Sequence, residues 1–200
     1  MTVDQSSGGS AAGAVPGPVT LIVIDVQRDF VPAPSGSAEA AQIGNIRRLV
    51  AVARANDIPV VFIRELHHPS LKDLGREVDG VEPVHCLEGT SGADYIDDFG
   101  PLPNEYEVRK RRYSAFFGTD LLTILRGYRT TTVVLVGGLT DVCVHYTAAD
   151  AHQHDYYIRV VDDAVYGSGD DAHRAALAAM AYLQRDAVID TEAAEGILRT

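Results

Sequence analysis

Three residues that could carry out covalent catalysis each lie at, or just past, the carboxyl end of a different predicted strand: Asp25, Lys110 and Cys143. The thiolate of a cysteine attacks carbonyl carbon, and a nearby carboxylate can accept the thiol proton. A lysine ammonium group beside them could hold both groups in their ionised forms. Because ligands of parallel α/β sheets bind beyond the carboxyl ends of the strands, we expect the three side chains to converge there. The residue types therefore predict nucleophilic attack by Cys143 on a carbonyl compound.

Cys143 lies where a predicted buried strand gives way to a helix. The apolar, β-branched run 133–136 has the length of a strand buried on both faces, and two glycines end it. Thr140 and Asp141 are typical helix-start residues. Cys143 then falls in the first turn of the helix, where unpaired N–H groups and the helix dipole bias a thiol towards thiolate.

Each of the three residues also has a structural explanation. Cys143 could be a small buried residue, and Asp25 could be a helix-capping or loop carboxylate. Lys110 could be one residue of a solvated basic run, 109–112. The catalytic interpretation is favoured because all three would otherwise have to occupy matching positions by accident.

The pattern of apolar runs predicts strands alternating with helices. The expected strands are 19–25, 59–63, 105–109, 133–136, 156–161 and 187–190, and the expected helices are 37–55, 119–126, one beginning near residue 140, and 170–184. Residues 64–104 show poor periodicity, so we expect a long functional loop with one short helix near 91–98. This alternation predicts a doubly wound, three-layer α/β fold with a six-stranded parallel sheet covered on both faces.

Composition bounds the class of protein. The 200 residues suffice for one domain, which we place at 18–200, after a Gly/Ala/Ser-rich arm at 1–17 that we expect to be disordered. A net charge of −11 argues against nucleic-acid and membrane partners. Two cysteines far apart in the chain, no apolar run of membrane-spanning length and no signal-peptide pattern favour a reducing, cytoplasmic location.

Three motifs follow one another along the chain: Asp25-x-Gln27-x-Asp29-Phe30, Lys110-x-x-x-Ser114-Ala115-Phe116-x-x-Thr119-x-Leu121 and Gly137-x-x-Thr140-Asp141-x-Cys143-Val144-x-x-Thr147-Ala148-x-Asp150-Ala151. They closely resemble the motifs of the isochorismatase-like cysteine hydrolases. The likeness runs from about residue 19 to 163, and three motifs in order make it specific. The family includes nicotinamidases, N-carbamoylsarcosine amidases, ureide and biuret hydrolases, and isochorismatases.

The resemblance implies a catalytic triad of Asp25, Lys110 and Cys143. It also implies a non-proline cis peptide between Gly138 and Leu139, with the amides of Leu139 and Cys143 forming an oxyanion hole. Isochorismatases that cleave a vinyl ether can lack the cysteine, so Cys143 favours hydrolysis of a non-peptide carbon–nitrogen bond through a thioester. We also expect a homo-oligomer, a dimer or tetramer, that acts on a small molecule.

Nicotinamidases of the family carry a metal site written Asp-x-His, with a second histidine in a His-Cys-x-x-Gly-Thr motif. Glu65-Leu-His67 and His85-Cys86-Leu-Glu-Gly-Thr nearly reproduce it here, with Glu in place of Asp. Two histidines and a carboxylate could hold zinc or a similar ion with open positions. The favoured interpretation is that His67 and His85 order the long loop, that Cys86 is a buried loop residue, and that activity needs no metal or other cofactor.

Phe30, Tyr113 and Phe116 flank the motifs, so we expect them to contact substrate in a small, partly aromatic pocket that suits a compact planar amide, ureide or carbamoyl compound. For Phe116, packing in the core is the alternative. Three other functions remain open: an isochorismatase, a catalytically silent interaction protein, and a nucleotide-binding module. The last lacks the third glycine of the dinucleotide motif, and Asp141 would place a negative charge where a pyrophosphate must sit.

Overall fold

The computed structural model describes residues 15–31, 38–80, 82–97 and 99–200. The expected arm at 1–17 therefore lies outside the described residues except for 15–17, and so does the expected Pro/Ser/Gly loop at 32–37. Residues 15–18 run along the start of the fourth strand, where the Pro16 carbonyl accepts a hydrogen bond from the Thr132 hydroxyl at 3.0 Å. Val15 packs against the core.

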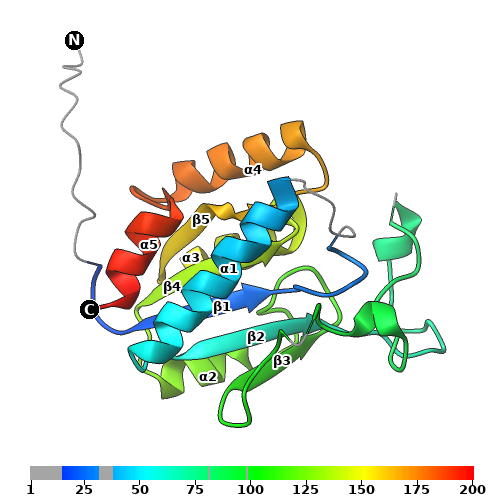
Figure 1. Cartoon of the computed structure of the whole chain (residues 1–200). Helices are drawn as coiled ribbons and strands as arrows, with labels where there is room; N and C mark the ends of the chain where they lie inside the picture. Colours follow the sequence, from blue (N-terminus) through cyan, green and yellow to red (C-terminus); the bar gives the residue numbers. More distant parts are fainter. Residues whose placement is uncertain (1–14, 32–37, 81, 98) are drawn as a thin grey trace.

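Six parallel strands form one sheet in the order β3-β2-β1-β4-β5-β6, which confirms the predicted fold class (Figure 1). The strands are β1 (Val19–Ile24), β2 (Val60–Glu65), β3 (Tyr106–Lys110), β4 (Thr132–Gly138), β5 (Tyr157–Tyr166) and β6 (Val188–Ile189). The central strands β1 and β4 are buried along their whole length, as expected for continuous apolar runs covered on both faces. Because strand order reverses between β1 and β4, the ends of these two strands flank the place where such folds bind ligands.

Helices cover both faces of the sheet, which gives the three layers. The helices are α1 (Ala38–Ala55), α2 (Leu121–Gly127), α3 (His145–Gln153), α4 (Asp170–Leu183) and α5 (Thr191–Leu198), with short turns η1 (Glu77–Asp79), η2 (Ser91–Ala93) and η3 (Thr140–Val144). Apolar residues of α1 and α5 form one core with one face of the sheet, and those of α2, α3 and α4 form a second core with the other. None of the described helices is long and apolar enough to cross a membrane.

Three predicted elements differ clearly from the structure, and one helix was not predicted. The expected helix at 91–98 is a single 3-10 turn, because the segment instead pairs with the residues that follow β1. The strand expected at 156–161 continues to Tyr166, and helix α5 was not predicted. The strand expected to end at Ile63 continues to Glu65, which brings a further carboxylate to the active edge of the sheet.

Candidate active site

The structure brings Asp25, Lys110 and Cys143 together at the carboxyl edge of the sheet. The Lys110 ammonium nitrogen lies 2.8 Å from Asp25 Oδ2 and 3.4 Å from Cys143 Sγ. All three residues are buried. An ammonium group therefore contacts both a carboxylate and a thiol in a site shielded from bulk water.

Different elements hold the three side chains in place. Asp25 follows β1 in a left-handed backbone conformation (φ 48°), and its N–H donates to the Ile63 carbonyl of β2 at 3.2 Å. Lys110 is the last residue of β3, and Cys143 lies inside the π-helical turn η3 that leads into α3. The peptide bond between Gly138 and Leu139, just before this turn, is cis, as the family resemblance implied.

Glu65 is the member of this cluster that sequence reasoning placed elsewhere. Its carboxylate forms an ion pair with Lys110, and its Oε2 lies 3.8 Å from Cys143 Sγ. Glu65 ends β2 directly opposite Lys110 in the strand register. Its position at the end of an apolar strand was the same signal that identified Asp25, but the predicted strand stopped two residues short.

Burial and charge set the protonation of the triad. Burial raises the pKa of Asp25 to about 6, although the adjacent Lys110 charge works in the opposite direction. Burial alone would lower the pKa of Lys110, but the charges of Asp25, Cys143 and Glu65 raise it well above its usual value. Near neutral pH the site thus holds a carboxylate at Asp25 and an ammonium group at Lys110.

The Cys143 thiol differs from the sequence expectation of a bias towards thiolate. Burial raises its pKa well above the usual value; the Lys110 charge works in the opposite direction, and the carboxylates of Asp25 and Glu65 add to the rise. A raised pKa favours the protonated thiol, so attack by this group would require a nearby carboxylate to accept its proton.

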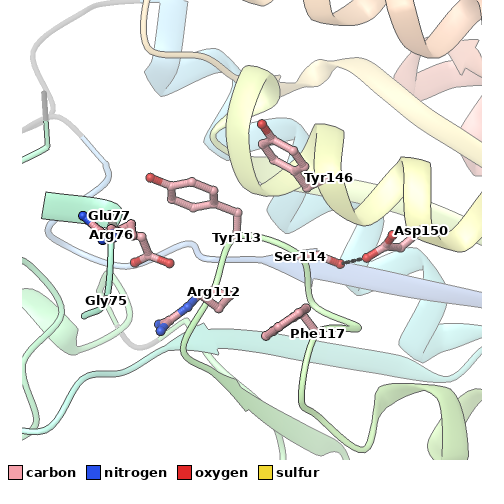
Figure 2. A pocket seen from close by; sticks show the side chains of 9 residues that line it. All are labelled: Gly75, Arg76, Glu77, Arg112, Tyr113, Ser114, Phe117, Tyr146 and Asp150. Carbon is pink, nitrogen blue, oxygen red and sulfur yellow. Dashed lines mark hydrogen bonds between the residues drawn. The ribbon is translucent and has the colours of Figure 1, made fainter. Parts of the chain in front are cut away.

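A pocket of about 440 Å³ lies beside this cluster (Figure 2). Its walls are Gly75, Arg76, Glu77, Arg112, Tyr113, Ser114, Phe117, Tyr146 and Asp150. The Tyr113 ring stacks on that of Tyr146 at 5.7 Å between centroids. None of the three clustered residues lines the pocket, but Tyr113 lies three residues after Lys110 and Tyr146 three residues after Cys143, so the wall is built from the segments that follow them.

Of the three predicted substrate contacts, Tyr113 lines this pocket. Phe116 does not line this pocket: its ring packs against those of His154 and Tyr156, the core packing named as the alternative, while its neighbour Phe117 lines the wall. Phe30 is also absent from the wall and packs instead against the ring of His85 at 5.3 Å.

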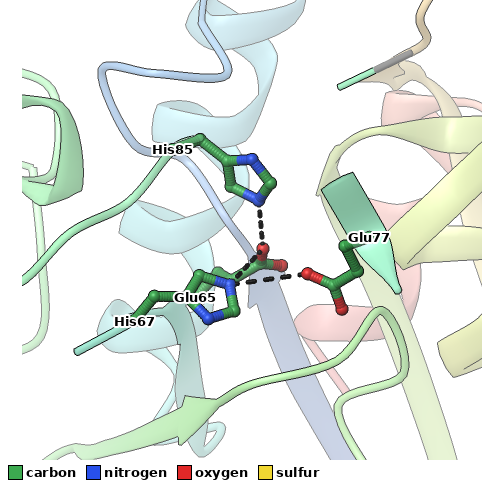
Figure 3. A group of neighbouring side chains, drawn as sticks. All are labelled: Glu65, His67, Glu77 and His85. Carbon is green, nitrogen blue, oxygen red and sulfur yellow. Dashed lines mark hydrogen bonds and ion pairs between the residues drawn. The ribbon is translucent and has the colours of Figure 1, made fainter. Parts of the chain in front are cut away.

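Glu65 and three further buried side chains, those of His67, Glu77 and His85, form a second cluster (Figure 3). Glu65 Oε1 lies 2.7 Å from His85 Nε2 and 3.2 Å from His67 Nε2. Glu77 Oε2, from turn η1, lies 3.5 Å from the same nitrogen of His67. One ligand atom from each of the four residues lies within 4.8 Å of the others.

These four residues fit a divalent cation. Two imidazole nitrogens and two carboxylates are a donor set that suits zinc. The carboxylate oxygens of Glu77 are buried and make no hydrogen bond within the described part of the chain. His85 Nδ1 lies 2.7 Å from the Pro83 carbonyl, an outer contact that would leave Nε2 free to bind a metal. The sequence pointed to Glu65, His67 and His85, but not to Glu77.

A family model described as the isochorismatase domain matches residues 19–193 of the chain. The chain is 30% identical over 204 residues to the ureidoacrylate amidohydrolase RutB of Methylobacterium radiotolerans, covering 86% of this chain and 79% of that protein. Among solved structures, a pyrazinamidase of Pyrococcus horikoshii in complex with zinc is 30% identical, with a TM-score of 0.75 over 87% of this chain and 99% of the other. An isochorismatase family protein of Burkholderia thailandensis is 27% identical, with a TM-score of 0.81 over 94% and 98%.

Proposed function

The chain belongs to the isochorismatase family, and we propose that it is a cysteine-dependent amidohydrolase of a small amide, ureide or carbamoyl compound. Its amidohydrolase relatives are hydrolases that act on carbon–nitrogen bonds other than peptide bonds, and the chain is classed with them. The observation that carries the proposal is the contact of Lys110 with both Asp25 and Cys143 inside a buried site.

In the proposed first half-reaction, Cys143 Sγ attacks the substrate carbonyl carbon while its proton passes to Asp25. The amides of Leu139 and Cys143 would stabilise the oxyanion of the tetrahedral intermediate. Asp25 then returns the proton to the leaving nitrogen, and ammonia departs as the carbon–nitrogen bond breaks. A thioester on Cys143 remains.

In the second half-reaction, Asp25 takes a proton from a water molecule, which attacks the thioester carbonyl. The carbon–sulfur bond breaks, the thiolate of Cys143 recovers a proton from Asp25, and a carboxylic or carbamic acid is released. Lys110 stays an ammonium group throughout, because three surrounding acidic groups raise its pKa. Its charge stabilises the thiolate and the Asp25 carboxylate in turn.

Glu65, His67, Glu77 and His85 would hold a divalent cation next to this machinery. When bound, such a cation would supply a fixed positive charge that attracts a polar group of the substrate or a water molecule. None of the bond-making steps above depends on it. Glu77 also lines the pocket, and the stacked Tyr113 and Tyr146 rings in its wall suit a planar substrate.

An ammonia-release screen over small carboxamides and ureides tests the proposal, with pyrazinamide, nicotinamide and ureidoacrylate in the panel. We expect at least one compound to release ammonia and to leave an acyl adduct on Cys143, detected by intact mass. Cys143→Ala should show neither, while Cys86→Ala, which alters the other buried cysteine, should show both. Turnover of isochorismate with no ammonia from any compound would refute the amidohydrolase and establish an isochorismatase. Inertness towards every compound, with unreactive Cys143, would establish a silent interaction protein.

A further inference from the structure

Tyr166 contacts the backbone at two places that matter for the proposed chemistry. It is the last residue of β5 and is buried, and its hydroxyl donates a hydrogen bond to the Asp25 carbonyl oxygen at 3.2 Å. Its ring lies flat against Gly138, where an added Cβ atom would come within 2.2 Å of a ring carbon. One side chain thus touches both the residue that carries the base and the residue that precedes Leu139.

The contact with Asp25 is made at a residue with an unfavourable backbone conformation. Asp25 has a φ of 48°, in the left-handed region that residues with a Cβ atom rarely adopt. Its N–H is bound by Ile63 of β2, and its carbonyl accepts from the Gln27 N–H at 2.8 Å and from Tyr166. Ile63 binds Asp25 from β2, on one side of β1, whereas the Tyr166 hydroxyl binds it from β5, which lies beyond β4 on the other side.

The strand register explains why Tyr166 reaches this place. Leu135 of β4 pairs with Val160 of β5, but Gly137 pairs with Val165, so β5 carries additional residues between the two pairs. This irregularity brings Tyr166 beside Gly138 at the end of the strand. A bulge next to an active site commonly re-aims a side chain in this way.

Core packing alone does not account for a tyrosine here. A phenylalanine would fill the same space without burying a hydroxyl, which costs free energy unless it finds a partner. The partner found is the carbonyl of the proposed catalytic base. Burial raises the pKa of Tyr166 far above its usual value, so the phenol stays a hydrogen-bond donor.

We propose that Tyr166 is a positioning residue that fixes the Asp25 backbone and the Gly138 end of β4 relative to each other. This inference rests on the proposed function, because the effect of Tyr166 is to orient Asp25 towards Cys143 and the Leu139 amide towards the substrate carbonyl. Tyr166 does not line the pocket that holds Tyr113 and Tyr146. Its loss therefore alters the rate of chemistry and leaves substrate binding unchanged.

The test compares Tyr166→Phe, which keeps the ring, with Tyr166→Leu, which removes both contacts. Tyr157→Phe is the matched control, because it makes the same change at the amino end of the same strand. On an amide that the wild type hydrolyses, we expect Tyr166→Phe to lower kcat about tenfold with KM unchanged, and Tyr166→Leu to lower it further. The control should match the wild type.

A second readout needs no substrate. Iodoacetamide labelling of Cys143 should be several-fold slower in Tyr166→Phe than in the wild type, with Asp25→Asn setting the value expected when the base is lost. Equal kcat and equal labelling in Tyr166→Phe and wild type would overturn the inference. If the wild type releases no ammonia, the amidohydrolase proposal fails, and the labelling rates alone then decide the role of Tyr166. Should Tyr166→Leu fail to fold, Tyr166→Phe carries the test.

Discussion

Glu65 and Lys110 are paired neighbours at the ends of β2 and β3, and their side chains form an ion pair that is closed to solvent. Burial alone would raise the pKa of Glu65, but the Lys110 charge and the hydrogen bonds from two histidines hold it well below its usual value. Glu65 also places one oxygen towards the triad and the other towards the histidines. It therefore joins the nucleophilic site to the candidate cation site.

Glu65→Gln should destabilise the fold strongly. Removing one member of a buried ion pair leaves a charge with too few partners, which typically lowers the free energy of unfolding by about 3–5 kcal/mol. Denaturant unfolding at pH 7 with EDTA present measures this value. At that pH the stabilisation is fully present, because a lowered folded-state pKa means that it is lost only as pH falls below the unfolded-state value.

Glu107→Gln provides the control for this measurement. Glu107 pairs with Arg109, whose side chain is 61% exposed, so its loss should change the free energy of unfolding by less than about 1 kcal/mol. Equal effects of the two substitutions would show that the Glu65–Lys110 pair adds little to stability.

Lys110→Ala should reduce turnover far more than Arg109→Ala. The Lys110 side chain is enclosed between Asp25 and Cys143, whereas the adjacent Arg109 is exposed and contacts Glu107. We expect a loss of roughly 10²-fold or more in kcat/KM for Lys110→Ala, and little change for Arg109→Ala. Steady-state ammonia release measures both, and comparable losses would mean that only the charge of the 109–112 run matters.

The activity should fall in acid with a limb near pH 6. The pKa of Asp25 is raised to about 6 by burial, and the proposed mechanism needs this carboxyl ionised in the free enzyme. A profile of kcat/KM against pH between 5 and 8 tests this expectation, and a flat profile down to pH 5 would remove Asp25 from the role of base. The effect of Asp25 on stability has the opposite sign, because a raised pKa means that stability falls as pH rises from about 4 to 6.

The positions of the triad could be predicted from sequence because apolar runs mark where buried strands end. Asp25 and Cys143 come after such runs, Lys110 ends a short strand of mixed polar and apolar residues, and the carboxyl ends of parallel strands share one edge of the sheet. The protonation of Cys143 could not be predicted in this way. Its position near a helix start favours thiolate, but burial beside two carboxylates outweighs that local effect.

Other features depend on contacts that no local pattern records. Glu77 lies in the poorly periodic segment 64–104, and tertiary packing alone places it beside His67. The strand predicted to end at residue 161 continues through Asp162 and Asp163, and the Asp163 carboxylate accepts hydrogen bonds from the N–H and hydroxyl of Thr191 at the start of α5. Because β5 extends to Tyr166, this side chain lies next to Asp25.

The candidate cation site gives the final prediction. Zinc should raise the melting temperature of the chelator-treated wild type, because a ligand that binds only the folded state stabilises it by mass action. Glu77→Gln and His85→Ala should weaken this shift, since each removes one of four convergent donors. His154→Ala, which alters a histidine outside the group, is the matched control and should leave the shift unchanged. Thermal unfolding with and without zinc measures the binding. Turnover of the chelated enzyme shows whether catalysis needs the ion; from the sequence we expect activity without a metal. If zinc shifts neither the wild type nor the control, the four side chains form a polar network that orders the loop, with Glu65 shared between the histidines and Lys110.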